Sequence, residues 1–346
     1  MLVHPPKARP GDRVAVVSPA FAAPAVGPAI HEQAMRRLVE ITGLEPVEYP
    51  TTRRLDATAE DRAADVNAAF ADPTIRAIVA TIGGDDQITV IPHLDAELIR
   101  RDPKPFVGYS DNTNLHDWLW RQGVASFYGG STQVQLGSGP RVDPAQAASL
   151  RASLLEGGVL ELTEPGESQD FGLDWGDPRA LTDGGERRAT EPWTWAGPAT
   201  SVTGATWGGC LEAIQWILTA GRGPAEPSAL DGGVLLVETS EELIPALEFG
   251  RILRSLGERG LLGAVKGVLV ARPPASNFEV LPTQVEQAEH RARQRDTAIE
   301  VIARYNPDAV VCVGVPFGHT RPQWIVPHGG EVTLDGAAQR VWADYR

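Results

Sequence analysis

The sequence predicts an α/β protein of two domains. Apolar strands and amphipathic helices alternate through the first half of the chain, which is typical of a parallel sheet covered by helices on both faces. With 346 residues, the chain exceeds one typical core. A run rich in Gly, Pro, Glu and Asp separates this half from a second one. We expect an N-terminal domain over 1–160, an interdomain loop over 161–198 and a C-terminal domain over 199–346.

Apolar periodicity predicts the elements of the first half in order. Strands are expected at 13–18, 45–49, 75–82 and 106–107, and helices at 27–42, 60–71, 95–101 and 113–122. In the helix over 27–42, for example, Ile30, Ala34 and Leu38 share one face. Sites in parallel sheets lie beyond the carboxyl ends of the strands, so the residues that follow these strands are the first candidates for function.

The second half also alternates. Strands are expected at 199–209, 233–239, 265–271 and 309–313, helices at 210–220, 243–256 and 284–305, and a terminal hairpin at 330–335 and 339–342. Before it, Trp175, Trp193 and Trp195 stand among polar residues of the interdomain loop. A long irregular segment with tryptophans forms a lid or pocket wall, or its tryptophans plug a domain junction, and the sequence leaves both alternatives open.

Charge and cysteine content exclude several classes of partner. The net charge of −14 argues against a nucleic-acid polymer or an anionic membrane as partner. The two cysteines, Cys210 and Cys312, lie outside any metal-ligand spacing, and we expect both to be buried. Neither a secretory signal nor an apolar run of membrane-spanning length is evident, so a cytoplasmic location is expected.

Ser110 is the first candidate catalytic residue. It follows the strand Phe106-Val107 and Gly108, and a helical pattern begins directly after it. Such a turn raises a hydroxyl above the sheet edge, beside the free N–H groups of a helix start. The simpler alternative is a helix N-cap, which serine favours. The turn also lacks the second glycine of G-x-S-x-G, because Asp111 and Asn112 follow the serine.

Glu238 and His319 are candidate partners of that serine. Glu238 ends the apolar run 234–237, and His319 follows the apolar run 309–313 within the loop 316–323. A neutral histidine takes a serine proton during attack, and a carboxylate on its other nitrogen fixes the tautomer. The order Ser, Glu, His is also that of α/β-hydrolases. Glu241 and Glu242 are expected in the first turn of the next helix, where acidic residues are favoured.

A glycine pair offers backbone donors for an oxyanion. Gly83 and Gly84 end the apolar strand 75–82, and glycine lets N–H groups approach a ligand closely. The N–H groups of Gly84 and Asp111 are therefore candidate oxyanion donors. A plain strand-to-helix turn is the alternative, and the glycines do not match a dinucleotide fingerprint.

Four segments together resemble the LD-carboxypeptidase family of serine peptidases, most of all its microcin C immunity branch. They are Thr81-Ile82-Gly83-Gly84-Asp85-Asp86, Pro105-Phe106-Val107-Gly108-Tyr109-Ser110-Asp111, Val237-Glu238-Thr239-Ser240-Glu241 and Pro316-Phe317-Gly318-His319. They occur in family order, and the similarity extends over nearly the whole chain. One departure is Gly208-Gly209-Cys210, where many relatives have Gly-Gly-Asn.

The resemblance implies a fold and a set of roles. The N-terminal domain is expected to be Rossmann-like, similar to class I glutamine amidotransferases, and the C-terminal domain to be a swivelling β-barrel-like α/β domain. Ser110 is implied as nucleophile, Glu238 and His319 as its partners, and Gly84 with Asp111 as oxyanion donors. A homodimer without metal or cofactor is implied as well.

The resulting hypothesis is a serine carboxypeptidase or amidase that works through an acyl-enzyme. Its partner would be a small-molecule or peptide substrate, with a peptidyl or aminoacyl adenylate analogue preferred because Trp193 or Trp195 would stack on adenine. The alternative is removal of the terminal D-amino acid from murein tetrapeptides, with Arg321 as the candidate carboxylate partner, although a surface salt bridge would explain this arginine equally well. A non-catalytic protein that binds a nucleotide or peptide is the alternative from another class.

Overall fold

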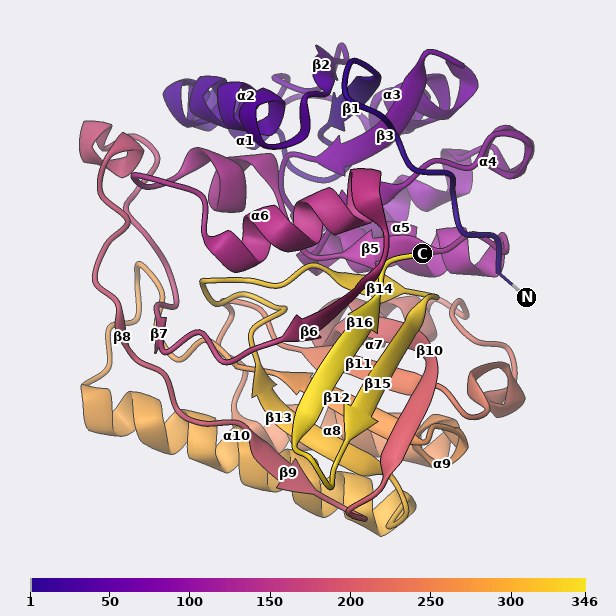
Figure 1. Cartoon of the computed structure of the whole chain (residues 1–346), viewed down its shortest axis with the longest axis vertical. Coiled ribbons are helices and arrows are strands. Elements are labelled where there is room, and N and C mark those ends of the chain that lie inside the picture. The colour runs from indigo at the N-terminus through magenta and orange to yellow at the C-terminus, as the bar shows by residue number, and fades with distance from the viewer. Residues whose placement is uncertain (1) are drawn as a thin grey trace.

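The computed structural model describes residues 2–346 and contains two large β-sheets, one above the other in Figure 1. The first sheet contains, in spatial order, β14 (Val326–His328), β5 (Ser126–Tyr128), β4 (Phe106–Gly108), β3 (Ile75–Ala80), β1 (Arg13–Val17) and β2 (Glu45–Glu48). Strands β1 to β5 pair in parallel, and β14 pairs antiparallel with β5. This confirms the predicted α/β fold and parallel sheet of the first half.

Helices bury both faces of the first sheet, as the alternating sequence pattern requires. Their bounds are α1 (Ala23–Val26), α2 (Pro28–Thr42), α3 (Ala59–Ala71), α4 (Ala96–Arg101), α5 (Thr113–Arg121) and α6 (Pro144–Arg151). Along β1, Val14 and Val16 belong to one core cluster, and Ala15 and Val17 to another. Because side chains of a strand alternate between faces, neither face of β1 meets water.

The second sheet has eight strands and is mixed. Its order is β6 (Val159–Leu162), β16 (Arg340–Asp344), β15 (Glu331–Asp335), β10 (Ser201–Cys210), β11 (Val234–Glu238), β12 (Gly267–Ala271), β13 (Val310–Val315) and β9 (Thr194–Ala196). Strands β10 to β13 pair in parallel, and the other pairs are antiparallel. The expected strand–helix alternation thus forms the middle of the sheet, and the expected terminal hairpin is β15–β16.

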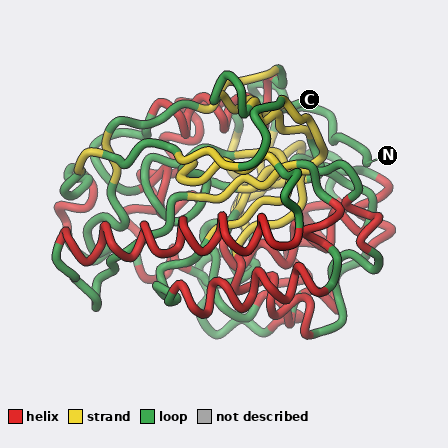
Figure 2. Tube along the Cα trace, turned by 90° about the horizontal axis from the view of Figure 1, so that it is seen from below, coloured by secondary structure: helices red, strands yellow, loops and turns green. Residues whose placement is uncertain are grey.

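Four helices accompany this sheet: α7 (Leu211–Thr219), α8 (Ala246–Glu258), α9 (Leu261–Ala264) and α10 (Gln284–Tyr305). Leu253 of α8 and Ile302 of α10 share a core cluster with Leu235 of β11 and Val268 of β12. Figure 2, viewed from below, shows helices in front of the strands. No helix within 2–346 is long and apolar enough to cross a membrane.

The segment between the two halves is less irregular than its composition suggests. It contains the short pair β7 (Glu167–Ser168) and β8 (Arg188–Ala189), and it contributes β9 to the second sheet. Strand β6 precedes it and also pairs within the second sheet, whereas β14 returns from the C-terminal half to the first sheet. The chain therefore crosses between the sheets more than once, and the boundaries at 160 and 198 stay a prediction.

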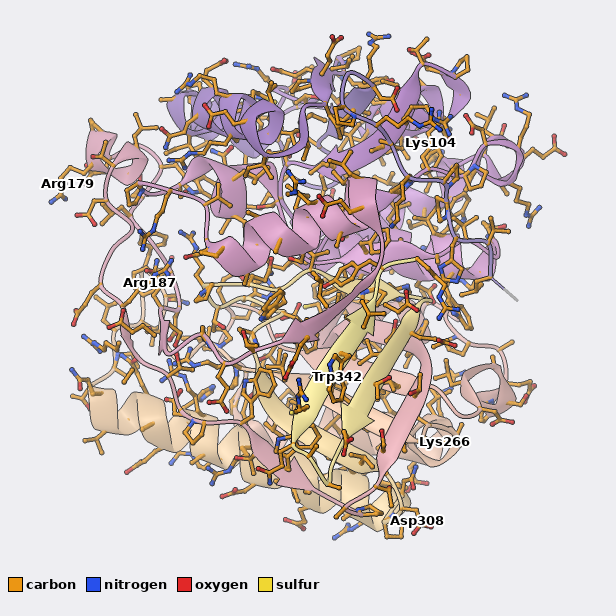
Figure 3. All side chains as sticks on the ribbon, in the orientation of Figure 1. Lys104, Arg179, Arg187, Lys266, Asp308 and Trp342 are labelled. Atoms are coloured by element: carbon orange, nitrogen blue, oxygen red, sulfur yellow. The ribbon has the colours of Figure 1, made fainter. Side chains whose placement is uncertain are left out.

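Lys104 offers a test of packing in the first sheet. Its buried ammonium donates to the carbonyls of Ala69, Phe70 and Asp72, at 2.9, 2.8 and 2.6 Å, where α3 ends. Lys104→Met leaves these carbonyls without their donor, so we expect the free energy of unfolding to fall by about 1–3 kcal/mol. Lys266→Met is the control, because Lys266 is exposed (Figure 3). Denaturant midpoints that fall equally in both variants would contradict this role.

Candidate active site

Ser110 lies on a strained turn directly after β4. Its φ is 64°, in the left-handed region that non-glycine residues rarely adopt. The chain then makes a short 3₁₀ turn over Ser110–Asn112 and continues into α5. The backbone N–H of Ser110 donates to the hydroxyl of Tyr128 at 3.0 Å, and the hydroxyl of Thr113 donates to its carbonyl at 2.6 Å. These bonds hold the predicted turn in its unusual conformation.

The structure brings Ser110, Glu238 and His319 together. The Nε2 atom of His319 lies 2.9 Å from the Ser110 Oγ, and its Nδ1 lies 2.7 Å from the Glu238 Oε2. Glu238 is the last residue of β11, and His319 lies in the loop that follows β13. The side chain of Glu238 is fully buried, and that of His319 is 7 % exposed. A continuous line of hydrogen bonds therefore connects a buried carboxylate with a serine hydroxyl.

Two glycines make this convergence sterically possible. A Cβ on Gly83 would lie 2.6 Å from the Ser110 Cβ and 2.9 Å from its Oγ. A Cβ on Gly318 would lie 2.6 Å from the Glu238 Oε2. Both distances are too short for real contacts, so any larger residue at either position would displace the side chain beside it.

Tyr128, which the sequence analysis did not identify, completes the environment of Glu238. Its hydroxyl donates to the Glu238 Oε1 at 2.5 Å while it accepts from the Ser110 N–H. Burial, together with the charge of Glu238, raises the pKa of Tyr128 well above its usual value, so the phenol keeps its proton. Tyr128 stands at the carboxyl end of β5, a strand of three residues that the sequence analysis did not expect.

A second carboxylate also reaches His319. The Glu241 Oε2 lies 3.1 Å from the His319 Nε2, although the Glu241 side chain is 67 % exposed. The expectation that Glu241 begins a helix is wrong, because α8 begins only at Ala246 and residue 241 lies in the preceding turn. That turn is held by buried Glu212, whose Oε1 accepts from the N–H and the hydroxyl of Ser240.

These carboxylates set the charge of the imidazole. Burial of His319 opposes protonation, but the charges of Glu238 and Glu241 outweigh it and raise its pKa to about 9. The imidazole nitrogen beside Ser110 therefore carries a proton at neutral pH and becomes a proton acceptor as the pH rises toward 9. Burial also raises the pKa of Glu212, with the charge of Glu238 as the next cause.

The predicted oxyanion donors lie on two loops that are tied together. The Asp111 Oδ2 accepts from the N–H of Gln87 at 2.8 Å, and the Gln87 side chain donates to Asn112 at 2.8 Å. The first hydrogen bond of the 3₁₀ turn is donated by the N–H of Asn112, so the N–H of Asp111 takes no part in the turn. The Asp111 nitrogen lies 3.2 Å from the position that a Cβ on Gly83 would occupy. Within residues 2–346, the N–H of Gly84 donates no hydrogen bond. Their role as oxyanion donors stays a prediction.

Asp111, at the position after the serine, is buried, and this burial raises its pKa to about 6. Its other oxygen accepts from the Asn114 side chain at 2.8 Å. Asp111 thus connects the serine turn to the glycine loop, whereas Asn112 stands where G-x-S-x-G has its second glycine. This tie was not foreseen from the sequence.

Arg321 lines a cavity of about 420 Å³ beside this site, and Trp193 and Trp195 do not. The two tryptophans flank or lie on the edge strand β9 and pack against the core cluster that includes Cys312 and Val310. Neither lines this cavity, the small one beside Thr239 or the one beside Arg291. The structure therefore does not bring them to the candidate active site, and contact between them and a substrate stays a prediction.

The pKa of His319 provides a test of this geometry. Glu241→Gln removes one of the two charges that favour the imidazolium, so we expect the His319 pKa to fall from about 9 toward its usual value. A histidine pKa that is raised in the folded state stabilises the fold at low pH, and this contribution is lost as the pH rises from about 6.5 to 9. In Glu241→Gln we therefore expect the free energy of unfolding to decrease less over that pH range. NMR titration of the imidazole C–H signals measures this pKa.

Glu242→Gln is the matched control, since Glu242 is an exposed neighbour that does not contact His319. Equal shifts of the His319 pKa in both variants would show that loop charge in general, and not the Glu241 contact, raises the value.

Comparison with known proteins identifies relatives for both halves of the chain. Family models described as the LD-carboxypeptidase N-terminal and C-terminal domains match residues 14–129 and 203–334. A putative carboxypeptidase of Vibrio cholerae is 27 % identical over 94 % of this chain and 92 % of its own. The microcin C7 self-immunity protein MccF of Escherichia coli is 25 % identical over 80 % of this chain and 76 % of its own.

A solved structure of MccF with adenosine monophosphate superposes with a TM-score of 0.83 at 20 % identity, covering 99 % of this chain and 98 % of the other. That likeness shows the same two-domain α/β fold. Matched in both halves and related over nearly its whole length, the chain belongs to the LD-carboxypeptidase family of peptidases.

Proposed function

We propose that this protein is a serine carboxypeptidase or amidase in which Ser110 is the nucleophile, His319 the general base and Glu238 its orienting carboxylate. The observation that carries the proposal is the line of hydrogen bonds from the Ser110 Oγ through both nitrogens of His319 to Glu238. The left-handed turn at Ser110 supports it, since strain of this kind is costly and occurs at functional sites.

Each atom of the line has a step in the reaction. The Ser110 Oγ attacks the amide carbonyl carbon while neutral His319 takes its proton at Nε2. Glu238 accepts the Nδ1–H and stabilises the resulting imidazolium. The oxyanion that forms is bound by the N–H groups of Gly84 and Asp111, each donor contributing about 3 kcal/mol. His319 then protonates the leaving amine, and water hydrolyses the acyl-Ser110 ester by the same steps.

The charge of His319 limits the reaction before substrate arrives. Only the neutral imidazole accepts the Ser110 proton, and with a pKa of about 9 this form is the minority at neutral pH. A substrate that separates Glu241 from His319 removes one cause of the raised pKa and increases the reactive fraction. Tyr128 keeps Glu238 in place throughout, because its hydroxyl bonds the carboxylate oxygen that His319 does not use.

Ser110→Ala tests the proposal directly. Without the nucleophile, amide hydrolysis should fall by about four to six orders of magnitude, and labelling by a fluorophosphonate probe should disappear. Ser255→Ala is the control, because Ser255 is an exposed serine of α8 whose hydroxyl bonds only its own helix. Circular dichroism checks that both variants fold. An unlabelled wild-type protein that still binds peptides tightly would instead establish the non-catalytic alternative.

Two substrate classes share this chemistry, and the surroundings of the site favour the peptide class. The cavity beside the site is lined by arginine and glutamine side chains and, within the described residues, by no aromatic one. Trp193 and Trp195, proposed to stack on adenine, pack against the core instead. A murein-type peptide with free carboxylates therefore fits better than an aminoacyl nucleotide. The nucleotide class remains the second candidate, since the solved MccF structures include nucleotide complexes.

A direct comparison of substrates tests this preference. The enzyme is incubated with the murein tetrapeptide L-Ala-γ-D-Glu-meso-diaminopimelate-D-Ala and, separately, with an aminoacyl sulfamoyl adenosine. Release of the terminal D-alanine with a kcat/KM at least ten times that for the nucleotide analogue is expected, and mass spectrometry follows both products. Faster cleavage of the nucleotide analogue would reverse the assignment without affecting the roles of the three catalytic residues.

A further inference from the structure

The cavity of about 420 Å³ adjoins the candidate active site through Tyr109. The ring of Tyr109 lies edge-on to the ring of His319, with the centroids 4.9 Å apart. Its hydroxyl accepts a hydrogen bond from Gln135, a cavity residue, at 3.3 Å. Arg321 and Gln323 also line the cavity and follow His319 by two and four residues. A substrate held at Ser110 therefore has a second, separate space within its reach.

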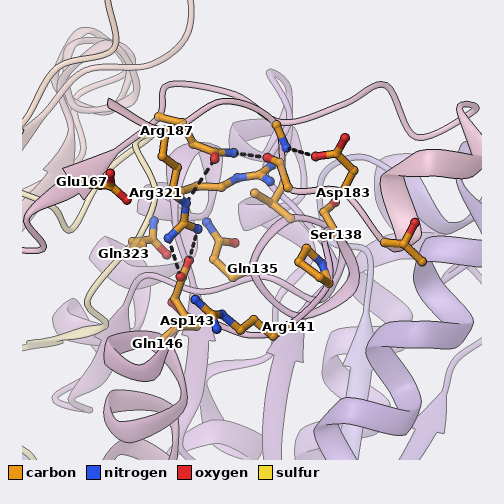
Figure 4. A pocket seen from close by; sticks show the side chains of 17 residues that line it. Gln135, Ser138, Arg141, Asp143, Gln146, Glu167, Asp183, Arg187, Arg321 and Gln323 are labelled. Carbon is orange, nitrogen blue, oxygen red and sulfur yellow. Dashed lines mark hydrogen bonds and ion pairs between the residues drawn. The ribbon is translucent and has the colours of Figure 1, made fainter. Parts of the chain in front are cut away.

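Arg321 carries a charge that the protein itself does not neutralise. Its guanidinium makes no hydrogen bond or ion pair with any residue of 2–346, and burial lowers its pKa. The neighbouring Arg187, by contrast, is paired with Asp143 through two bonds of 2.7 Å (Figure 4). An unpaired guanidinium that has lost part of its hydration is unfavourable, and an anionic ligand would compensate for it.

Gln146 is a second unsatisfied group in the same cavity. It is 1 % exposed, and neither Oε1 nor Nε2 has a partner among residues 2–346. Both amide atoms of the neighbouring Gln323 are used, because its Oε1 accepts from the Gly130 N–H and its Nε2 donates to the Gly318 carbonyl. A buried amide without hydrogen-bond partners is unfavourable, so Gln146 lowers the stability of the ligand-free protein.

We propose that this cavity binds a carboxylate of the substrate, with Arg321 as its ion-pair partner and Gln146 Nε2 as a second donor. The inference rests on the proposed function, because it concerns the peptide that Ser110 would cleave. A carboxylate matches the planar fork of a guanidinium and also accepts from an amide N–H. It would supply the Arg321 guanidinium and the Gln146 Nε2 with the acceptor that the protein does not provide, and leaves the Gln146 Oε1 as it is.

The charges of the cavity favour a carboxylate over a phosphate. Once Arg187 and Asp143 are paired, two lining arginines have no ion-pair partner among residues 2–346: half-buried Arg321, whose charge one carboxylate balances, and Arg141, which is exposed at the rim. The remaining acids, Glu167 and Asp183, are also exposed at the rim, where with Arg141 they leave one net negative charge that would repel a dianionic phosphate more than a monoanion.

Direct binding to the Ser110→Ala enzyme tests the proposal without turnover. The probes are the murein tetrapeptide as the free acid and the same peptide with every carboxyl amidated, measured by calorimetry. We expect the acid to bind at least tenfold more tightly than the amide. Adding Arg321→Gln should bring this ratio close to one, and Arg321→Lys should leave an intermediate ratio because it keeps the charge but loses the fork.

Two further variants make the result unambiguous. Arg179→Gln removes the same charge from a side chain that is 71 % exposed and labelled in Figure 3, and it should leave the ratio unchanged. Gln146→Leu removes the unsatisfied amide at similar volume, so it should raise the melting temperature of the empty protein and weaken binding of the acid peptide. Gln146→Leu also keeps the test open if Arg321→Gln does not fold.

Three results would overturn the carboxylate site. They are an acid-to-amide ratio that Arg321→Gln leaves unchanged, binding of neither peptide by the Ser110→Ala enzyme, and loss of adenosine monophosphate binding in Arg321→Gln while acid-peptide binding persists. Failure of the proposed function would be seen separately, as hydrolysis that continues in Ser110→Ala, and would not alter the binding ratio.

Discussion

The buried carboxylate of Glu238 is the group on which the rest of the site depends. A carboxylate removed from water is tolerated only where both of its oxygens are bonded. Here one oxygen accepts from Tyr128, which belongs to the first sheet, and the other from His319, which follows a strand of the second. Neither sheet alone satisfies Glu238. The Glu238 carboxylate can therefore stay buried only because the two sheets pack together there.

One strand connects the two partners of Glu238. The loop with His319 leads directly into β14, which leaves its own half of the chain and pairs with β5 in the first sheet. In that ladder Val326 lies opposite Tyr128. The positions of the imidazole and the phenol are therefore fixed by the same backbone hydrogen bonds, seven residues from His319. A shift of β14 along β5 would move both side chains relative to Glu238 at once.

Strand ends explain why part of the site was predictable. Ser110, Glu238 and His319 each follow an apolar run, and the rule that parallel sheets collect function at their carboxyl ends is enough to group them. The sequence analysis expected neither β5 nor β14, and β14 reaches β5 from the distant C-terminal half, so Tyr128 could not be found in this way.

The remaining differences arise from tertiary packing. Composition placed Trp193 and Trp195 in an irregular loop, but their side chains are half-buried against the core because a short strand there completes the edge of the second sheet. Glu241 satisfies the rule for a helix start, yet the helix begins five residues later and the carboxylate turns toward His319. Local sequence patterns do not predict these contacts, because the contacting residues are distant in sequence. The local conformational preferences are also weaker than the tertiary packing.

Charge is distributed unevenly around the site, and this favours one orientation of a bound substrate. Glu212, Glu238 and Glu241 surround the imidazole, whereas Arg321 lies unpaired beyond Tyr109. The whole chain has a net charge of −14, so its long-range field repels acidic peptides. Screening limits that repulsion to about 8 Å at physiological salt. Within that range the glutamates repel an acidic peptide and the guanidinium attracts it, so under the proposed function we expect a carboxylate to enter the cavity while the uncharged amide remains beside Ser110.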